Sequence, residues 1–251
     1  MRRRRFSSAL PILALLLLAG CGASTLPQVH SEAERLALAR QMIAKRQYTQ
    51  AVELLKSFVS NNIGSAQVDE AIYLLGDSEL KIKDWTAAQL DFERLLRDYP
   101  ESDSSAAAAF SLGEALYGQA RGPDFDQEYT EKALEQWARY HHDYPEHWRQ
   151  PEAERRIAEA RSRLASKWLK NGNLYLKLKL ADPARIYFHR VVDDFSDTQQ
   201  AADATIGLAL ADALAGDRAG AIERLRRLEQ EFAGQPLAAR ARNERARLEH
   251  R

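Results

Sequence analysis

Cysteine is nearly absent from this chain. Among 251 residues only Cys21 carries a thiol, so the fold cannot rest on an intrachain disulfide or on a zinc site built from several cysteines. Packing must hold the folded part, which a chain of this length with 45% hydrophobic residues can achieve. A membrane-spanning run is absent too. The apolar run at residues 9–18 is about half of the roughly 20 residues that a spanning helix needs, and it contains Pro11.

Sequence signatures of catalysis and of nucleic-acid binding are missing as well. The chain has no glycine-rich phosphate loop, no nucleophile elbow and no pair of carboxylates in a catalytic spacing. Lysine and arginine together number 36, as do aspartate and glutamate, so there is no basic excess of the kind that binds nucleic acid. We therefore predict a protein that is not an enzyme and that has no nucleic-acid partner. An enzyme with an unrecognised site is the alternative.

The start of the chain has the pattern of a lipoprotein signal. Four arginines at 2–5 precede the apolar run, and the small residues Ala19 and Gly20 lie immediately before Cys21. This order predicts a signal peptide over residues 1–20, cleavage before Cys21, and a diacylglycerol and an N-acyl chain such as palmitate on Cys21, with no other cofactor. Two or more chains anchor a protein stably to a membrane. Cleavage would leave a mildly acidic chain, because four arginines and no acidic residue are lost. A plain secretory signal is the alternative.

An internal repeat organises the rest of the chain. Five alanines recur at intervals of 37, 45, 51 and 37 residues, namely Ala51, Ala88, Ala133, Ala184 and Ala221. Apolar residues follow each alanine at offsets of four and seven, and mostly aromatic residues follow at offset eleven, which places all of them on one face of an α-helix. Each stretch follows another helical stretch, as in a tetratricopeptide repeat. We predict an all-α solenoid of about five helix-turn-helix repeats.

The two long intervals mark insertions. The interval that ends at Ala133 has eight extra residues around Arg121-Gly122-Pro123-Asp124, which predicts a loop. The interval of 51 residues has fourteen extra residues, and the segment 152–179 contains no proline. Fourteen residues lengthen a helix by roughly 21 Å, so we expect a long helix that projects beyond its neighbours.

The repeat pattern also predicts the domain boundaries. Ser31 and Glu34 form a capping-box pattern, so the first helix begins there and residues 21–30 are a lipidated tether of at most about 30 Å. A final stretch rich in arginine and alanine is suited to close the stack. The solenoid then covers residues 31–249, with repeats near 31–62, 65–100, 102–145, 151–196 and 198–233 and a capping helix over 236–249.

Several motifs, taken in their order along the chain, resemble the BamD family of tetratricopeptide lipoproteins. They are the cysteine motif at residue 21, Asp98-Tyr99-Pro100, the segment 126–130, Asp143-Tyr144-Pro145, the long helix and the segment 194–198. The resemblance covers nearly the whole chain and is closest over residues 124–198. The segment 101–109, rich in serine and alanine, departs from the family, whose members usually have a His-Pro pair and two tyrosines there.

The resemblance implies a non-catalytic scaffold of the β-barrel assembly machinery, anchored in the bacterial outer membrane and facing the periplasm. In that family the C-terminal repeats contact the barrel insertase, which has POTRA-type periplasmic domains, and the N-terminal repeats face unfolded outer-membrane proteins or other lipoproteins of the machinery. Gly22, in place of an aspartate after the cysteine, fits delivery to the outer membrane. An envelope lipoprotein that organises peptidoglycan or cell-division enzymes is the alternative function.

The concave face of such a solenoid is the first candidate binding surface, because its residues are not needed for packing. We expect first-helix residues to line it, namely Tyr73, Asp77, Leu80 and Tyr117. Their mixture of aromatic and polar groups suits a peptide that ends in an aromatic residue. Packing of the two tyrosines between repeats is the alternative.

The long helix carries the second candidate surface. Arg163, Lys167 and Lys170 are spaced by four and three residues and so share one face, and Trp168 is adjacent in sequence. We interpret these cations as a docking surface for an acidic partner or for anionic headgroups. A solvated helix face is the alternative.

Histidines at 141, 142 and 147 form the one cluster that could hold a metal ion. Adjacent histidines point about 100° apart on a helix, and no second cluster supplies further ligands. We therefore predict no metal site.

Overall fold

The computed structural model describes residues 31–250; the signal peptide, the tether and the lipidation of Cys21 lie outside the described residues. Residues 31–250 form eleven helices and no strand, which confirms the all-α prediction. The helices are α1 (Glu32–Ala44), α2 (Tyr48–Asn61), α3 (Val68–Lys81), α4 (Trp85–Asp98), α5 (Ser105–Gln119), α6 (Glu128–Asp143), α7 (Gln150–Lys177), α8 (Ala181–Asp194), α9 (Gln199–Leu214), α10 (Arg218–Glu231) and α11 (Pro236–Glu249).

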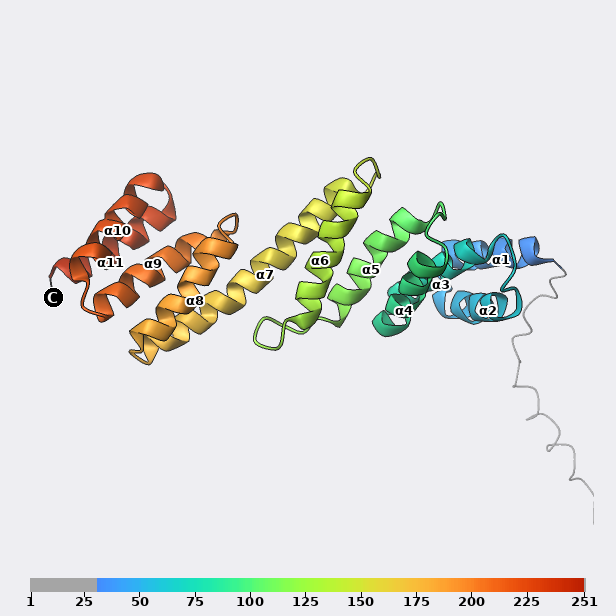
Figure 1. The fold of residues 1–251 in the computed structure, drawn as a ribbon, viewed down its shortest axis with the longest axis horizontal. Helices are drawn as coiled ribbons and strands as arrows, with labels where there is room; N and C mark the ends of the chain where they lie inside the picture. The colour runs from blue at the N-terminus through green and yellow to red at the C-terminus, as the bar shows by residue number, and fades with distance from the viewer. Residues whose placement is uncertain (1–30, 251) are drawn as a thin grey trace, which may run out of the picture.

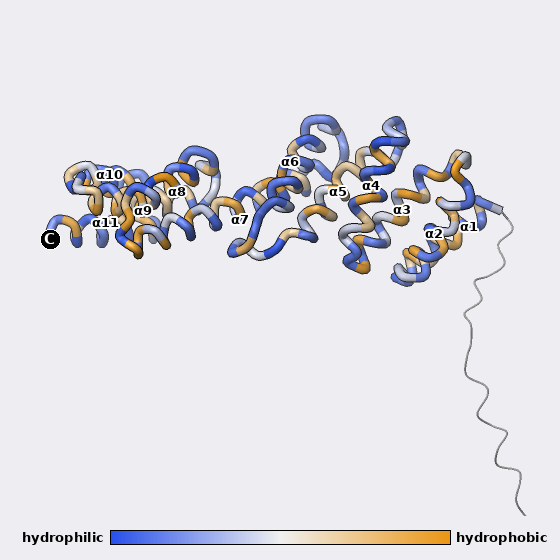
Figure 2. Tube along the Cα trace, turned by 60° about the horizontal axis from the view of Figure 1, so that its bottom comes forward, coloured by the Kyte–Doolittle hydropathy of each residue, from blue (hydrophilic) through white to orange (hydrophobic). Residues whose placement is uncertain are grey.

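Consecutive helices pack side by side and form an elongated stack, which runs from right to left in Figure 1. Five antiparallel pairs, from α1–α2 to α9–α10, follow one another, and α11 covers the last pair by packing on α10 and α9. Apolar and polar positions alternate along the helical tube in Figure 2, as expected where each helix buries one face. No helix among residues 31–250 is both long and apolar enough to span a membrane.

The first helix begins where the capping box predicts. The Ser31 hydroxyl accepts a hydrogen bond of 3.2 Å from the Glu34 amide, and the Glu34 carboxylate accepts one of 3.2 Å from the Ser31 amide. These two bonds satisfy amide groups that have no partner inside the helix.

The repeated apolar face forms the core of the stack, as predicted. All five repeat alanines and the residues four and seven positions after them are buried. The residue at offset eleven is the C-cap of the same helix in every repeat: Asn62, Tyr99, Tyr144, Phe195 and Phe232. The buried face therefore ends where each second helix ends.

Aromatic side chains of this face fill gaps opened by glycine, as Trp137 and Phe188 show. A Cβ atom added to Gly113 would lie 2.3 Å from the Trp137 indole nitrogen, so α5 and α6 can approach this closely only with glycine at position 113. Phe188 of α8 lies against Gly172 of α7 and Gly207 of α9 in the same way, with added Cβ atoms 2.6 and 2.5 Å from its ring. The glycines let one large ring bind two helices together.

The long helix α7 has 28 residues, about 42 Å at 1.5 Å per residue, and runs diagonally through the middle of the stack (Figure 1). The expectation that it projects beyond its neighbours is wrong. Ala153 and Ala160 in its first half belong to the core formed with α1–α6, whereas Leu164 and Ala165 belong to a second core with α8 and α9. A projecting end would leave this apolar strip in water. Helix α7 therefore carries the main contacts between the first three helix pairs and the rest of the chain.

Candidate functional site

The residues predicted to bind peptide lie on α3 and α5 and are only partly accessible. The Tyr73 ring packs against Phe92, with centroids 6.2 Å apart. Tyr117 donates a hydrogen bond of 3.1 Å to Glu159 of α7, and its ring lies 5.5 Å from that of Trp137. Burial raises the pKa of both phenol groups. Both tyrosines thus also join neighbouring helices.

The other two predicted peptide-binding residues are on the same helix as Tyr73. The Asp77 carboxylate lies 3.7 Å from the Lys81 ammonium group one helical turn later. Leu80 is half-buried and packs at the edge of the first core. A peptide-binding role for this set remains a prediction.

The three predicted docking cations of α7 contact the inserted loop of residues 120–127. Arg163 donates to the carbonyl oxygens of Ala120, at 3.3 Å, and of Arg121. Lys167 donates to a loop carbonyl at Phe125, and Lys170 forms an ion pair with Asp124. The two insertions of the chain therefore pack against each other. Sequence spacing places the three cations on one helix face, but it does not reveal which segment covers that face.

The buried side chain of Gln127 holds the loop together by hydrogen bonds. Sequence analysis did not predict this role. The buried side-chain nitrogen of Gln127 lies within 3.4 Å of four loop carbonyl oxygens, those of Arg121, Gly122, Phe125 and Asp126. Its side-chain oxygen accepts a hydrogen bond of 2.9 Å from Thr130. The loop consequently has a defined shape and presents Asp124 to α7. A lone glutamine at a loop end has no sequence signal that would mark this role.

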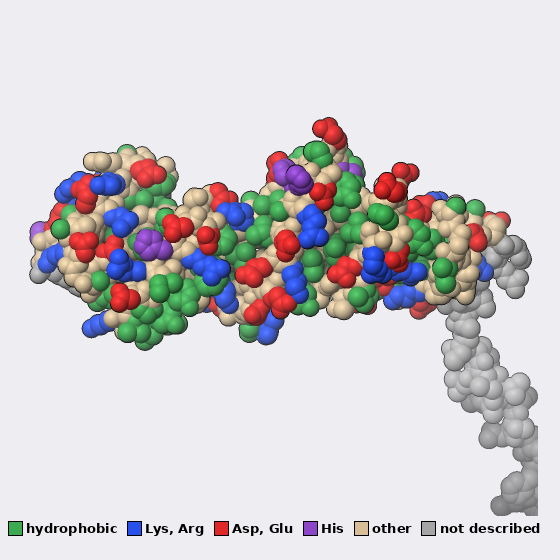
Figure 3. Space-filling model, viewed as in Figure 1, with side chains coloured by type: hydrophobic (Ala, Val, Ile, Leu, Met, Phe, Trp, Pro, Cys, Tyr) green, Lys and Arg blue, Asp and Glu red, His purple; other side chains and the backbone are tan. Residues whose placement is uncertain are grey.

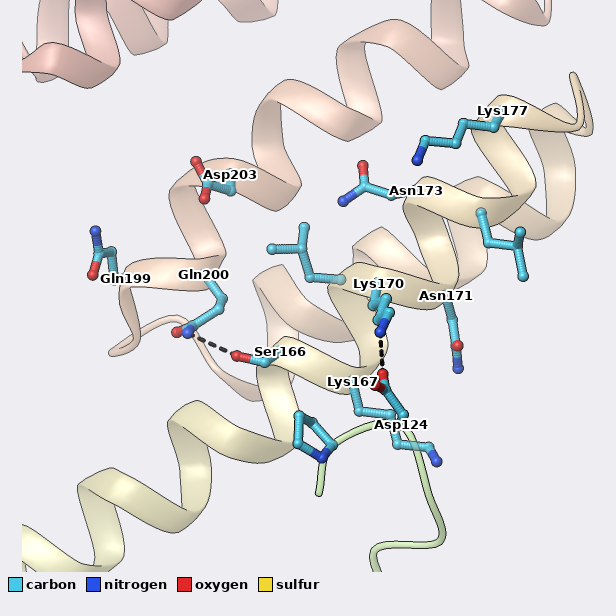
Figure 4. A pocket seen from close by; sticks show the side chains of 13 residues that line it. Asp124, Ser166, Lys167, Lys170, Asn171, Asn173, Lys177, Gln199, Gln200 and Asp203 are labelled. Carbon is cyan, nitrogen blue, oxygen red and sulfur yellow. Dashed lines mark hydrogen bonds and ion pairs between the residues drawn. The ribbon is translucent and has the colours of Figure 1, made fainter. Parts of the chain in front are cut away.

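A cleft of about 700 Å³ opens where the loop, the second half of α7 and the start of α9 meet (Figure 4). Three lysines and four side-chain amides line it together with two aspartates and a few apolar groups. The lining residues are Pro123, Asp124, Ser166, Lys167, Leu169, Lys170, Asn171, Asn173, Leu174, Lys177, Gln199, Gln200 and Asp203. Gln200 ties α9 to α7 by donating to the hydroxyls of Ser162 and Ser166 at 3.0 and 2.9 Å. Such a lining can bind a ligand by charge and by hydrogen bonds.

An exposed apolar patch lies beside this cleft, at the α7–α8 turn. Four aliphatic side chains are 47–69% exposed there, namely Leu174, Leu178, Leu180 and Ile186. Apolar side chains gather at this end of α7 and α8 in Figure 3. Clustering of exposed large apolar residues is typical of a protein-interaction surface.

Aromatic rings stack next to the patch. The Tyr187 ring lies between those of Trp168 and Tyr175, at centroid distances of 5.7 and 5.3 Å, and the Arg190 guanidinium lies 3.8 Å from the Trp168 ring centroid. Tryptophan, tyrosine and arginine are the residues that most often dominate binding energy at protein interfaces. We call the four aliphatic and three aromatic side chains, with Arg190, the α7–α8 patch. Sequence analysis recognised Trp168 alone of this group.

Comparison with models of known protein families identifies the family of this chain. Residues 78–227 match the YfiO family, described as an outer membrane lipoprotein, and this span is more than half of the chain. The chain belongs to the YfiO family of outer membrane lipoproteins. This confirms the resemblance to BamD-type proteins. Helices α4 to α9, the inserted loop and the α7–α8 patch all lie inside the YfiO match.

Two of the solved structures that are similar to this YfiO-family chain are tetratricopeptide repeat proteins. TTC0263, a thermophilic tetratricopeptide protein of Thermus thermophilus, is 21% identical, with 87% of this chain and 98% of that chain covered and a TM-score of 0.40. A tetratricopeptide protein of Parabacteroides merdae is 14% identical, with 87% and 73% covered and a TM-score of 0.38. No curated protein matches the chain.

Two histidines of the cluster at 141–147 have protein partners in the YfiO-family chain. His147 and the Tyr140 hydroxyl share a hydrogen bond of 2.6 Å, and His141 lies 2.5 Å from the Gln150 side-chain oxygen. Burial, followed by repulsion from Arg149, lowers the pKa of His147. Within residues 31–250 no three or more His, Cys, Asp or Glu side chains are placed to hold a metal ion.

A cluster of ionisable groups lies between α2, α3 and α4 and was not predicted. Glu79 is fully buried, and the Lys56 ammonium group lies 2.9 Å from its carboxylate. The pKa of Asp91 is raised to about 7, chiefly by burial and secondly by repulsion from Glu79. Two carboxyl groups therefore compete for the single lysine.

The raised pKa of Asp91 predicts a dependence of stability on pH. The folded chain binds this proton more tightly than the unfolded chain, in which the ordinary pKa is 3.8, so the contribution of Asp91 to stability is lost as the pH rises towards 7. Asp91→Asn removes the charge that Glu79 repels and should therefore stabilise the protein at pH about 8. We expect a gain of only about 1–2 kcal/mol, because Asp91 is half-buried and water screens the repulsion. Urea unfolding at several pH values measures the difference. Asp182→Asn, at a side chain that is 89% exposed, is the control. A constant difference between pH about 5 and about 8 would contradict the assignment.

Proposed function

We propose that this chain is a lipid-anchored, periplasm-facing scaffold of the β-barrel assembly machinery, which assists the insertion of outer-membrane proteins by binding other proteins. Membership of the YfiO family of outer membrane lipoproteins carries the proposal. The lipoprotein signal that ends at Cys21 supports the lipid anchor. The stack of helix pairs supports a binding role, since such stacks present extended surfaces.

Within this scaffold the α7–α8 patch is the docking surface for the barrel insertase. Its stacked rings and its bordering arginine match the composition of interface hot spots, and its exposed leucines and isoleucine add an apolar surface of the kind that marks interaction sites. The concave residues Tyr73, Asp77, Leu80 and Tyr117 are the second surface, and they receive unfolded segments that end in an aromatic residue.

Affinity purification of the full-length lipoprotein from solubilised envelope tests the proposal. We expect the barrel insertase with POTRA-type domains to co-purify, together with other lipoproteins of the machinery. Leu178→Asp with Ile186→Asp should abolish recovery of the insertase, because each change places a charge in an apolar contact. Leu90→Asp, at a residue that is 60% exposed on α4, is the matched control. Recovery of cell-wall enzymes without the insertase would reject the proposal.

The lipid anchor is tested separately. Cys21→Ala removes the thiol that accepts the diacylglycerol, so the protein should lose its stable, salt-resistant attachment to the outer membrane. Fractionation of envelopes followed by a high-salt wash measures this. Retention of the variant in the washed outer membrane would show that another feature anchors the chain.

A further inference from the structure

We propose that the cleft between α7, α9 and the inserted loop binds an extended acidic segment of a partner protein. The cleft has a structural origin that a regular repeat pair lacks. It lies where the loop of residues 120–127 meets the second half of α7, and both segments are insertions relative to the shorter repeats. We infer that the insertions build this cleft, which lies next to the α7–α8 patch but uses different side chains apart from Leu174.

The charges of the cleft favour an anionic ligand. Its two carboxylates are already neutralised, because Asp124 pairs with Lys170 and Asp203 lies 2.5 Å from Arg240. Lys167 donates to a neutral carbonyl group and so keeps its charge. Within the described part of the chain, Lys177 has no carboxylate partner. Two positive charges are thus uncompensated, in a protein whose acidic and basic residues are otherwise balanced.

The amides of the cleft favour a peptide backbone. Asn171, Asn173 and Gln199 form no side-chain hydrogen bond among residues 31–250, and each amide offers donors as well as an acceptor. An extended peptide exposes N–H and C=O groups that need both kinds of partner. In Figure 4, Asn173 and Lys177 point from α7 into the space that faces Asp203 of α9. Leu169 and Leu174 add apolar contacts for side chains of the bound segment. A lipid headgroup would use the lysines but would leave most of these amides unpaired.

Fluorescence anisotropy with the full-length lipoprotein in neutral detergent micelles tests the inference. The probe is a labelled peptide of alternating glutamate and serine with a central leucine, and the same peptide with lysine in place of glutamate is its counterpart. We expect binding of the glutamate peptide only. Lys167→Glu with Lys177→Glu should weaken it about tenfold or more. Asp124→Asn should strengthen it by about threefold, because it releases the charge of Lys170.

The matched control is Lys45→Glu with Lys83→Glu, two exposed lysines in the turns of the first two helix pairs. It should leave the affinity unchanged, and circular dichroism checks that each variant is folded. Equal losses in the two double variants, or no loss in the first, would overturn the inference. Displacement of the peptide by phosphatidylglycerol added to the micelles would overturn it in favour of a lipid ligand. The assay contains no insertase, so its outcome is independent of the proposed function.

Discussion

Replacement of Trp137 by alanine is expected to lower the free energy of unfolding by about 3–5 kcal/mol. Trp137 is among the largest fully buried side chains of the described residues, and it fills the space that Gly113 leaves between α5 and α6. Its indole N–H donates a hydrogen bond of 3.2 Å to the carbonyl oxygen of Phe110. Alanine would create a cavity and remove the hydrogen bond that the indole adds between α6 and α5, and both effects destabilise the fold.

Thermal and urea unfolding followed by circular dichroism measure this loss. Trp148→Ala is the matched control, because it makes the same chemical change at a side chain that is 77% exposed, and it should change stability by less than about 0.5 kcal/mol. Hydrogen exchange should show the loss of protection first in α5 and α6, since units of a repeat stack can open locally. Similar losses for the two tryptophan variants would contradict the packing described for Trp137.

Replacement of Ala158 by proline is the second change with a large expected effect. Ala158 is exposed in the interior of α7, so the substitution alters the backbone and little else. Proline removes a helical hydrogen bond and clashes with the preceding turn, at a cost of about 3 kcal/mol or more. Because α7 joins the core of α1–α6 to that of α8 and α9, a kink there should also change how the two parts are oriented.

Small-angle X-ray scattering detects the change in orientation of the two parts as a change in the longest dimension of the protein. Ala158→Gly is the control for helix propensity alone, with an expected cost of about 1 kcal/mol and an unchanged scattering curve. A proline variant with the scattering curve of the wild type would show that contacts other than the continuous α7 fix the arrangement.

Local periodicity is what the sequence by itself determined about this protein. The five alanines, the residues at offsets four and seven and the capping box at Ser31 lie where the sequence places them. The helix over the second insertion was predicted too, because 152–179 contains no proline. These features depend on residues within a few turns of one helix, and the spacing of 3.6 residues per turn is enough to group them on a face.

Only the tertiary structure decided which distant segments meet. The loop of residues 120–127 returns to α7, so Arg163, Lys167 and Lys170 contact its backbone and Asp124. Glu79 and Asp91, on different helices, lie close enough to repel each other. The α7–α8 patch combines side chains of α7 with side chains of α8, so it forms only when the two helices pack together. Each of these outcomes depends on the angles between helices and on the path of a loop, and the periodicity of a single helix contains information on neither.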